Sequence, residues 1–196
     1  MNKTLKSLFP VAVQTVFLDR DGVVNEKMPE GRYVTRWDEF HALPDVAKAI
    51  RLLNQSGIRV IVVSNQRGIA LGLYTAETVW AIHAEFQKLL KVEGAHVDDF
   101  YFCPHDNGQC NCRKPLSGMF EQAVADFPAI NAATCVMIGD SKSDMEFGQR
   151  LGMMTAFIVG LPERQKPDAE VASEMADLRY SSLYKAVCDL LTRSVP

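Results

Sequence analysis

The sequence predicts an α/β fold, a Rossmann-like parallel sheet with helices on both faces. Three observations support this prediction: short apolar runs, amphipathic segments between them, and polar residues where the runs end. Nearly continuous apolar runs are typical of strands that are buried on both faces, and their alternation with helices is typical of a parallel sheet. The runs cover residues 15–18, 59–64, 98–102, 134–138 and 155–159.

The segments between the runs carry apolar residues at helical spacing, which predicts helices packed against the sheet. Thr75 and Ser143 are the predicted N-caps of two of these helices. Gly57 and Gly152 follow the last apolar residue of their segments and are predicted to end two helices. The predicted helices cover residues 46–53, 79–89, 120–127, 145–151 and 183–191.

Length and composition indicate one compact domain over residues 1–196, because 47% of the 196 residues are hydrophobic. A net charge of -3 offers no basic surface for nucleic acid or an anionic membrane. No apolar run reaches the roughly 18 residues of a membrane span. The apolar stretch in the opening segment, residues 1–13, is too short for a secretion signal and is interrupted by Pro10. We therefore expect a cytoplasmic monomer. The segment 161–177, rich in Pro, Glu and Lys, is expected to be a mobile surface excursion.

Polar residues suited to phosphate chemistry follow four of the predicted strands. They are Asp19 and Asp21, Ser64, Lys114 and Asp140. Because parallel strands end at the same edge of a sheet, these side chains should meet where an open α/β fold binds its ligands. Carboxylates, a hydroxyl and an ammonium can hold Mg²⁺ and neutralise a phosphoryl group. Each residue alone is more often a cap, a turn or a surface group, but their common order favours one phosphate-ester hydrolysis site.

The spacing of Asp19 and Asp21 permits two roles. Alternate residues of an extended strand point the same way, so both carboxylates are expected on one side while Arg20 points away. Asp19 would attack phosphorus, and Asp21 would protonate the leaving alkoxide and then activate water. Asp19 and Asp140 are the predicted direct Mg²⁺ ligands.

A second metal-binding pattern lies in the loop over residues 103–112. Three cysteines and one histidine at this spacing favour structural Zn²⁺, although a disulfide or idle cysteines are alternatives. A nucleic-acid-binding zinc finger is disfavoured because no basic helix is present. Zinc would stiffen the loop that precedes Arg113 and Lys114. His41, His83 and His96 are expected to be ordinary surface or boundary histidines. The predicted zinc ligands are Cys103, His105, Cys110 and Cys112.

The motifs DRDG, CRKP and GDSKSD, with Ser64 after an apolar strand, resemble the haloacid dehalogenase superfamily of phosphatases. The resemblance implies an aspartyl-phosphate intermediate formed on Asp19. It implies that Asp21 is the general acid and base, and that Ser64 and Lys114 stabilise the transferred group. Mg²⁺ would be held by Asp19, the main-chain carbonyl of Asp21, and Asp140. Assistance from the Ser141 carbonyl, or from Asp144 through water, stays open.

NQRGIALG, the zinc loop, CRKP and the pair Gly118-Met119 further resemble the D-glycero-D-manno-heptose 1,7-bisphosphate 7-phosphatases. That resemblance implies a minimal cap and a phosphorylated sugar substrate selected by the zinc loop and its neighbours. The short loop between His105 and Cys110 is instead similar to that of the histidinol-phosphate phosphatases, and an apparent insertion at residues 27–32 departs from the heptose pattern. A histidinol-phosphate or other small-metabolite phosphatase is therefore the alternative. A noncatalytic zinc-stabilised binding module is a third alternative, which would lack a catalytic residue. By the heptose likeness, the substrate-binding residues would be Asn65, Gln66, Arg67 and Arg113.

Overall fold

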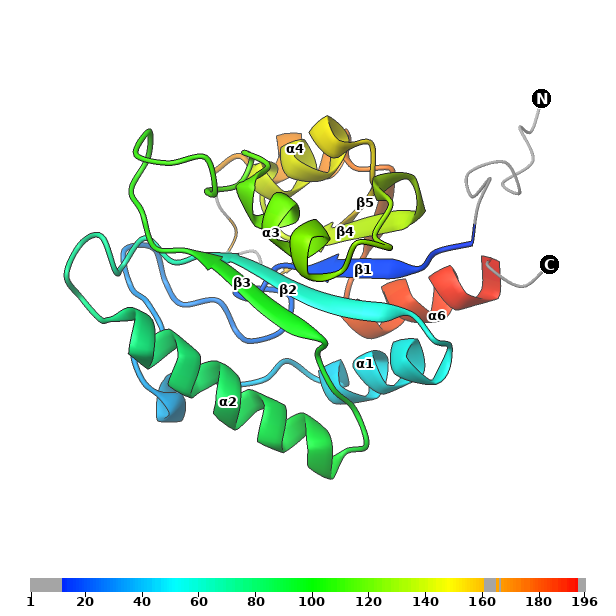
Figure 1. The fold of residues 1–196 in the computed structure, drawn as a ribbon, viewed down its shortest axis with the longest axis horizontal. Helices are drawn as coiled ribbons and strands as arrows, with labels where there is room; N and C mark the ends of the chain where they lie inside the picture. The colour runs from blue at the N-terminus through cyan, green and yellow to red at the C-terminus, as the bar shows by residue number, and fades with distance from the viewer. Residues whose placement is uncertain (1–11, 161–164, 166, 194–196) are drawn as a thin grey trace.

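A computed structural model describes residues 12–160, 165 and 167–193, so residues 1–11 of the opening segment lie outside the described residues. These residues form a sheet of six parallel strands in the order β3-β2-β1-β4-β5-β6 (Figure 1). The predicted parallel α/β fold is therefore confirmed. The strands are β1 (Thr15–Leu18), β2 (Arg59–Asn65), β3 (Asp99–Cys103), β4 (Cys135–Gly139), β5 (Met154–Ile158) and β6 (Leu178–Tyr180).

The strand order reverses at β1, which is the feature that positions a site. β1 pairs with β2 on one side, where Phe17 faces Ile61, and with β4 on the other, where Phe17 faces Met137. The chain runs outward from β1 to β3 and then returns to add β4 on the opposite side. Loops diverge at such a reversal and leave a crevice at the carboxyl ends of the strands.

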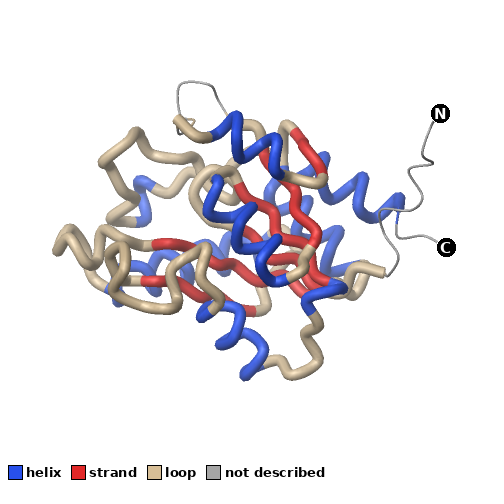
Figure 2. The backbone as a smooth tube through the Cα atoms, turned by 90° about the horizontal axis from the view of Figure 1, so that it is seen from above, coloured by secondary structure: helices blue, strands red, loops and turns tan. Residues whose placement is uncertain are grey.

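Helices cover both faces of the sheet, as predicted. In Figure 1, α1, α2 and α6 lie below the sheet, and α3 and α4 lie above it. Figure 2 shows long loops gathered beyond one end of the strands. The α-helices are α1 (Val46–Gln55), α2 (Ala76–Val92), α3 (Gly118–Asp126), α4 (Lys142–Leu151), α5 (Ala169–Met175) and α6 (Leu183–Arg193), with 3-10 turns η2 (Trp37–Glu39) and η3 (Ala132–Thr134). No helix among the described residues is long and apolar enough to cross a membrane.

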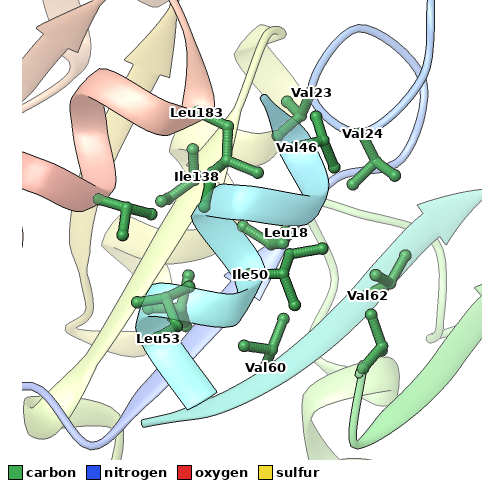
Figure 3. Close-up of a cluster of buried hydrophobic side chains, with 14 of the residues drawn as sticks. Leu18, Val23, Val24, Val46, Ile50, Leu53, Val60, Val62, Ile138 and Leu183 are labelled. Atoms are coloured by element: carbon green, nitrogen blue, oxygen red, sulfur yellow. The ribbon is translucent and has the colours of Figure 1, made fainter. Parts of the chain in front are cut away.

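Alternate side chains of each central strand enter different cores. Leu18 of β1 packs in the cluster that contains Ile50 of α1 and Leu183 of α6 (Figure 3). Phe17, one residue earlier, packs in the opposite cluster with Phe147 of α4. Strands buried on both faces explain why the sequence shows continuous apolar runs rather than alternation.

Two predicted helix starts have different outcomes. Thr75 caps α2, since its side chain accepts a hydrogen bond from the backbone N–H of Thr78 at 3.3 Å. Ser143 is not a cap, and that prediction is wrong. Ser141 caps α4, and the carboxylate of Asp144 accepts the Ser141 backbone N–H at 3.1 Å in a capping box. The predicted stops at Gly57 and Gly152 agree with the ends of α1 and α4.

The expected surface excursion at 161–177 is wrong for its second half. Residues 161–164 and 166 lie outside the described residues, but α5 occupies Ala169–Met175. Ala169 and Ala172 are buried in a cluster with Met145 and Phe157. The small alanine side chains allow this short helix to approach α4 and β5 closely, a contact that the polar composition of the segment does not reveal.

The expectation for His83 is also wrong, whereas His41 and His96 are exposed. His83 lies on the buried face of α2 and is 2% exposed, with its ring stacked on Phe100 at 4.4 Å between centroids. Burial lowers the pKa of His83 to about 3. This histidine is therefore an uncharged core residue at neutral pH.

Gly148 tests how closely α4 packs on the sheet. A Cβ atom at this position would lie 2.6 Å from Cγ2 of Thr155 and 3.0 Å from Cβ of Met137. Gly148→Ala should lower the free energy of unfolding by about 1–3 kcal/mol, because overpacking outweighs the roughly 1 kcal/mol gain in helix propensity. Chemical denaturation measures this. Arg150→Ala, at an exposed position of the same helix, is the control and should change stability little. A stabilised Gly148→Ala protein contradicts the prediction.

Candidate active site

The structure brings the predicted residues of three strand ends into direct proximity. Asp19 follows β1, Lys114 lies in the loop after β3, and Asp140 follows β4. One carboxylate oxygen each from Asp19, Asp140 and Asp144 lie within 4.8 Å of one another. Ser64, near the end of β2, is buried at 1% exposure. The reversal of strand order at β1 thus brings the carboxylate cluster together at the carboxyl ends of β1 and β4.

Lys114 is the centre of the hydrogen-bond network. Its ammonium donates to Asp19 at 2.8 Å and to the backbone carbonyl of Val63 at 2.7 Å, and it lies 2.6 Å from Asp144. The Asn65 side chain accepts the backbone N–H of Lys114 at 2.9 Å and donates to its carbonyl at 3.0 Å. Asn65 therefore fixes the loop that carries Lys114. Its predicted contact with substrate stays a prediction.

The charged groups of this cluster shift one another's pKa values. Burial disfavours the ammonium of Lys114, but the carboxylates of Asp144 and Asp19 outweigh burial and raise its pKa. Burial, and then the nearby charge of Asp144, raise the pKa of Asp19. Lys114 consequently stays charged at neutral pH, and its removal would leave two buried carboxylates without the cation that they share.

The prediction that Arg20 points away is wrong. The Arg20 guanidinium donates to both carboxylate oxygens of Asp21, at 2.9 and 2.8 Å, and Asn25 and Gln66 donate to the same carboxylate at 3.0 and 3.3 Å. The turn allows this because the Arg20 carbonyl accepts the backbone N–H of Asn25 at 3.1 Å, which curls the chain back. Burial works against the ionised carboxyl, but Arg20 and the other donors lower the pKa of Asp21.

Gln66 connects this carboxylate to Ser64. Its amide nitrogen donates to the Ser64 hydroxyl at 2.6 Å as well as to Asp21, and its amide oxygen accepts the Tyr74 hydroxyl at 2.8 Å. The Tyr74 bond fixes the direction in which the amide faces. Gln66 therefore positions two of the predicted catalytic groups, and its contact with substrate stays a prediction.

The carboxylate cluster fits a divalent cation with hard oxygen ligands such as Mg²⁺. Asp140 is packed against the tight turn after β1, where a Cβ at Gly22 would lie 2.2 Å from its Oδ2 atom. Gly22 has φ of +97°, so only glycine suits this turn. Burial raises the pKa of Asp140 to about 7, although the Lys27 ammonium beside it opposes the shift. Asp144 bonds to Ser141 and to Lys114, which favours a supporting role.

Two charged residues of the site escaped the sequence analysis. Lys27 forms an ion pair with Asp140, and Arg20 holds Asp21. Lys27 belongs to the apparent insertion at 27–32, where no motif indicates a role. Arg20 lies inside DRDG, and its position between two functional carboxylates was the one available signal.

The zinc loop gathers its four predicted ligands. The sulfur of Cys103 lies 3.5 Å from that of Cys110, and the sulfurs of Cys110 and Cys112 lie 3.3 Å apart. Nδ1 of His105 lies 3.3 Å from the Cys112 sulfur and 3.7 Å from that of Cys103. A tetrahedral zinc site with bonds of about 2.3 Å has sulfur atoms roughly 3.8 Å apart, so the set fits zinc with little adjustment. All five cysteines are free thiols, which argues against the disulfide alternative.

Both predicted substrate-binding arginines donate hydrogen bonds to side chains of the zinc loop. Arg67, which follows β2, donates to the Asp106 carboxylate at 2.6 and 3.1 Å. Arg113 donates to the Asn107 side chain at 2.7 Å. The bond from Arg67 is the main cause of the lowered pKa of Asp106. The loop therefore holds two cations that adjoin residues of the site in the chain, since Arg67 follows Gln66 and Arg113 precedes Lys114.

The fold and site define a class of protein, and comparison with known sequences agrees. The sequence profile of the haloacid dehalogenase-like hydrolases matches residues 3–152, and the chain belongs to this family. It is a phosphatase, a phosphoric monoester hydrolase.

Several relatives are named for the alpha or beta anomer of one sugar bisphosphate. The chain is 37% identical over 137 residues to the D-glycero-alpha-D-manno-heptose-1,7-bisphosphate 7-phosphatase of Mycobacterium tuberculosis (strain CDC 1551 / Oshkosh), covering 69% of this chain and 72% of that protein. It is 32% identical over 184 residues to the D-glycero-beta-D-manno-heptose-1,7-bisphosphate 7-phosphatase of Yersinia pestis, covering 90% of this chain and 96% of that protein. A crystal structure of D,D-heptose 1,7-bisphosphate phosphatase from B. bronchiseptica, complexed with magnesium and phosphate, superposes with a TM-score of 0.82 at 30% identity, covering 92% and 99%.

Asp140 predicts a pH dependence of metal binding. A carboxyl with a pKa of about 7 is mostly protonated below that pH, and a divalent cation binds only the ionised form. Mg²⁺ affinity should therefore rise up to roughly tenfold per unit as pH rises towards about 7, and level off above it. Titration calorimetry from about pH 5.5 to 8.5 measures this. Asp140→Asn should weaken binding and remove the dependence, whereas equal wild-type affinity at both ends of the range contradicts the prediction.

Proposed function

We propose that this protein hydrolyses the 7-phosphate of D-glycero-D-manno-heptose 1,7-bisphosphate in a Mg²⁺-dependent reaction. The observation that carries the proposal is the match of 32% identity over 90% of the chain to a heptose bisphosphate phosphatase. The carboxylate cluster beside two loop-held arginines supports it, because the substrate carries two phosphates. Relatives named for the alpha and for the beta anomer both match, so the anomer is a matter for experiment.

Asp19 is the proposed nucleophile. It attacks phosphorus, the bond from phosphorus to the sugar oxygen breaks, and an aspartyl phosphate forms. Lys114, in contact with Asp19 at 2.8 Å, offsets the negative charge that approaches this carboxylate. Ser64 supplies a hydroxyl for the transferred group, held in place by Gln66.

Asp21 is the proposed acid and base. It gives a proton to the departing sugar oxygen, then accepts one from the water that attacks the aspartyl phosphate, releasing phosphate and free Asp19. Its contacts with Arg20, Asn25 and Gln66 favour the ionised form. The charge of the arriving phosphate must therefore favour protonation of Asp21 before the first step.

Mg²⁺ would be held by Asp19, the main-chain carbonyl of Asp21, and Asp140. When bound, it would neutralise the phosphate and orient it for attack. The protein positions the carboxylates of the cluster. Asp140 packs against the turn at Gly22, and the capping box with Ser141 holds Asp144.

The zinc loop is proposed to select a doubly anionic substrate. Arg67 and Arg113, oriented by Asp106 and Asn107, would receive the phosphate that is not cleaved, for which a guanidinium is suited. The loop and the residues that it holds present two guanidinium groups and one carboxylate, Asp106, so their net positive charge favours an anionic group over a cationic substrate such as histidinol phosphate. Free thiols at the loop suit a reducing compartment such as the cytoplasm.

A substrate panel tests the function. We expect kcat/KM for one heptose 1,7-bisphosphate anomer to exceed that for histidinol phosphate and heptose 7-phosphate by at least about tenfold, because only the bisphosphate engages both arginines. Phosphate release measures the rates, with 7-phosphate loss verified by product analysis. Asp19→Asn should abolish turnover and retain the circular dichroism spectrum of the wild type. Preference for histidinol phosphate would overturn the substrate, and an active Asp19→Asn enzyme would overturn the mechanism.

Zinc removal tests the role of the loop. Cys110→Ser should lose zinc and raise KM about tenfold or more while kcat changes less, because the arginines lose their fixed positions. Metal analysis and steady-state kinetics at saturating Mg²⁺ measure these effects. Cys188→Ser, which alters a cysteine of α6 outside the cluster, is the control. An unchanged KM in zinc-free, folded protein would show that the loop does not position substrate contacts.

A further inference from the structure

Lys27 is a site residue that the proposed mechanism does not use. It lies in the loop between β1 and η2, yet its side chain is only 16% exposed and its ammonium contacts Asp140, 113 residues away in the chain. It therefore differs from an ordinary surface lysine, whose charge is held in water. The contact is made to a carboxylate that the proposed function assigns to Mg²⁺.

The backbone beside Lys27 is firmly held. Glu26 donates its backbone N–H to the carbonyl of His41 at 2.8 Å, and the Asn25 side chain donates to the Glu26 carbonyl at 2.8 Å. Asn25 itself is fully buried. The loop thus leaves the core in a fixed direction and aims the Lys27 side chain at the carboxylate cluster.

Lys114 and Lys27 contact different carboxylates of the cluster. Lys114 contacts Asp19 and Asp144, and Lys27 contacts Asp140. Asp140 is 8% exposed, and a buried carboxylate is costly to ionise without a nearby cation. Lys27 is therefore the cation that balances the one carboxylate of the cluster that Lys114 does not contact.

We propose that Lys27 competes with Mg²⁺ for Asp140, which stabilises the metal-free protein and lowers its affinity for the metal. This inference rests on the metal site of the proposed function, and not on the identity of the sugar. A divalent cation on Asp140 would either displace the Lys27 ammonium or lie beside it and be repelled. Displacement weakens metal binding because it breaks the ion pair of Lys27 with Asp140, and the other arrangement weakens it because two cations meet at one carboxylate with little water to screen them.

Lys27→Met tests the proposal because it keeps the aliphatic stem and removes the charge. Titration calorimetry of the zinc-loaded, Mg²⁺-free protein with MgCl₂ should show affinity about tenfold tighter than that of the wild type. The melting temperature of the variant should be lower than that of the wild type without Mg²⁺, and the difference should shrink when Mg²⁺ is saturating.

Two further variants separate charge from packing. Lys27→Arg keeps the charge and should bind Mg²⁺ like the wild type. Lys142→Met removes a lysine two residues after Asp140 whose side chain is 43% exposed and pairs with Glu146. It should change neither the Mg²⁺ affinity nor the melting temperature as Lys27→Met does. Tightening by Lys27→Arg or by Lys142→Met as large as that by Lys27→Met would overturn the proposal.

Equal or weaker Mg²⁺ affinity in Lys27→Met would also overturn it, leaving the metal site intact. A wild-type protein that binds no Mg²⁺ would overturn the metal site and this inference together. Neither result bears on the choice of sugar, which the substrate panel addresses separately.

Discussion

A lysine ammonium buried between two carboxylates is the constraint on which the site depends. Lys114 contacts Asp19 after β1, Asp144 in α4 and the Val63 carbonyl in β2, so three chain segments must converge on one group. Burial makes any incomplete version of this arrangement costly. The capping box at Ser141 and the Asn65 clamp on the Lys114 backbone are local structures that satisfy this single requirement.

The placement of Lys114 also involves the loop after β3 that carries it. The loop that presents Lys114 is also the loop that gathers the zinc ligands and holds the two arginines. Arg113 of this loop directly precedes Lys114, and Asp106 of the same loop holds Arg67. If the proposed roles are correct, the charge for catalysis and the charge for substrate selection are both positioned by one short stretch of chain.

Much of this architecture was predictable from the sequence because it depends on local patterns. Apolar runs gave the first five strands, and residues that follow such runs, like Asp19 and Asp140, lie together because parallel strands end at one edge. The four residues of the predicted zinc site do come together, as their close spacing in the sequence indicated. The strand β6 was missed because its three residues carry too short a pattern to detect. The role of Lys27 and the burial of His83 depend on contacts made only after folding, for which the sequence gives no signal. The contact of Arg20 with Asp21 also forms only in the folded turn, and the place of Arg20 inside DRDG was its one signal.

The order of the strands has a consequence for how the site forms during synthesis. Lys114 and Asp19 are 95 residues apart in the chain, and β1 gains its second neighbour only when β4 is added. A nascent chain that has left the ribosome as far as β3 contains the proposed nucleophile but not its Asp140 or Asp144 partners. Such long-range closure is slow compared with helix formation. Phosphatase activity should therefore appear only after β4 and α4 have left the ribosome, and fragments that end before β4 should have none.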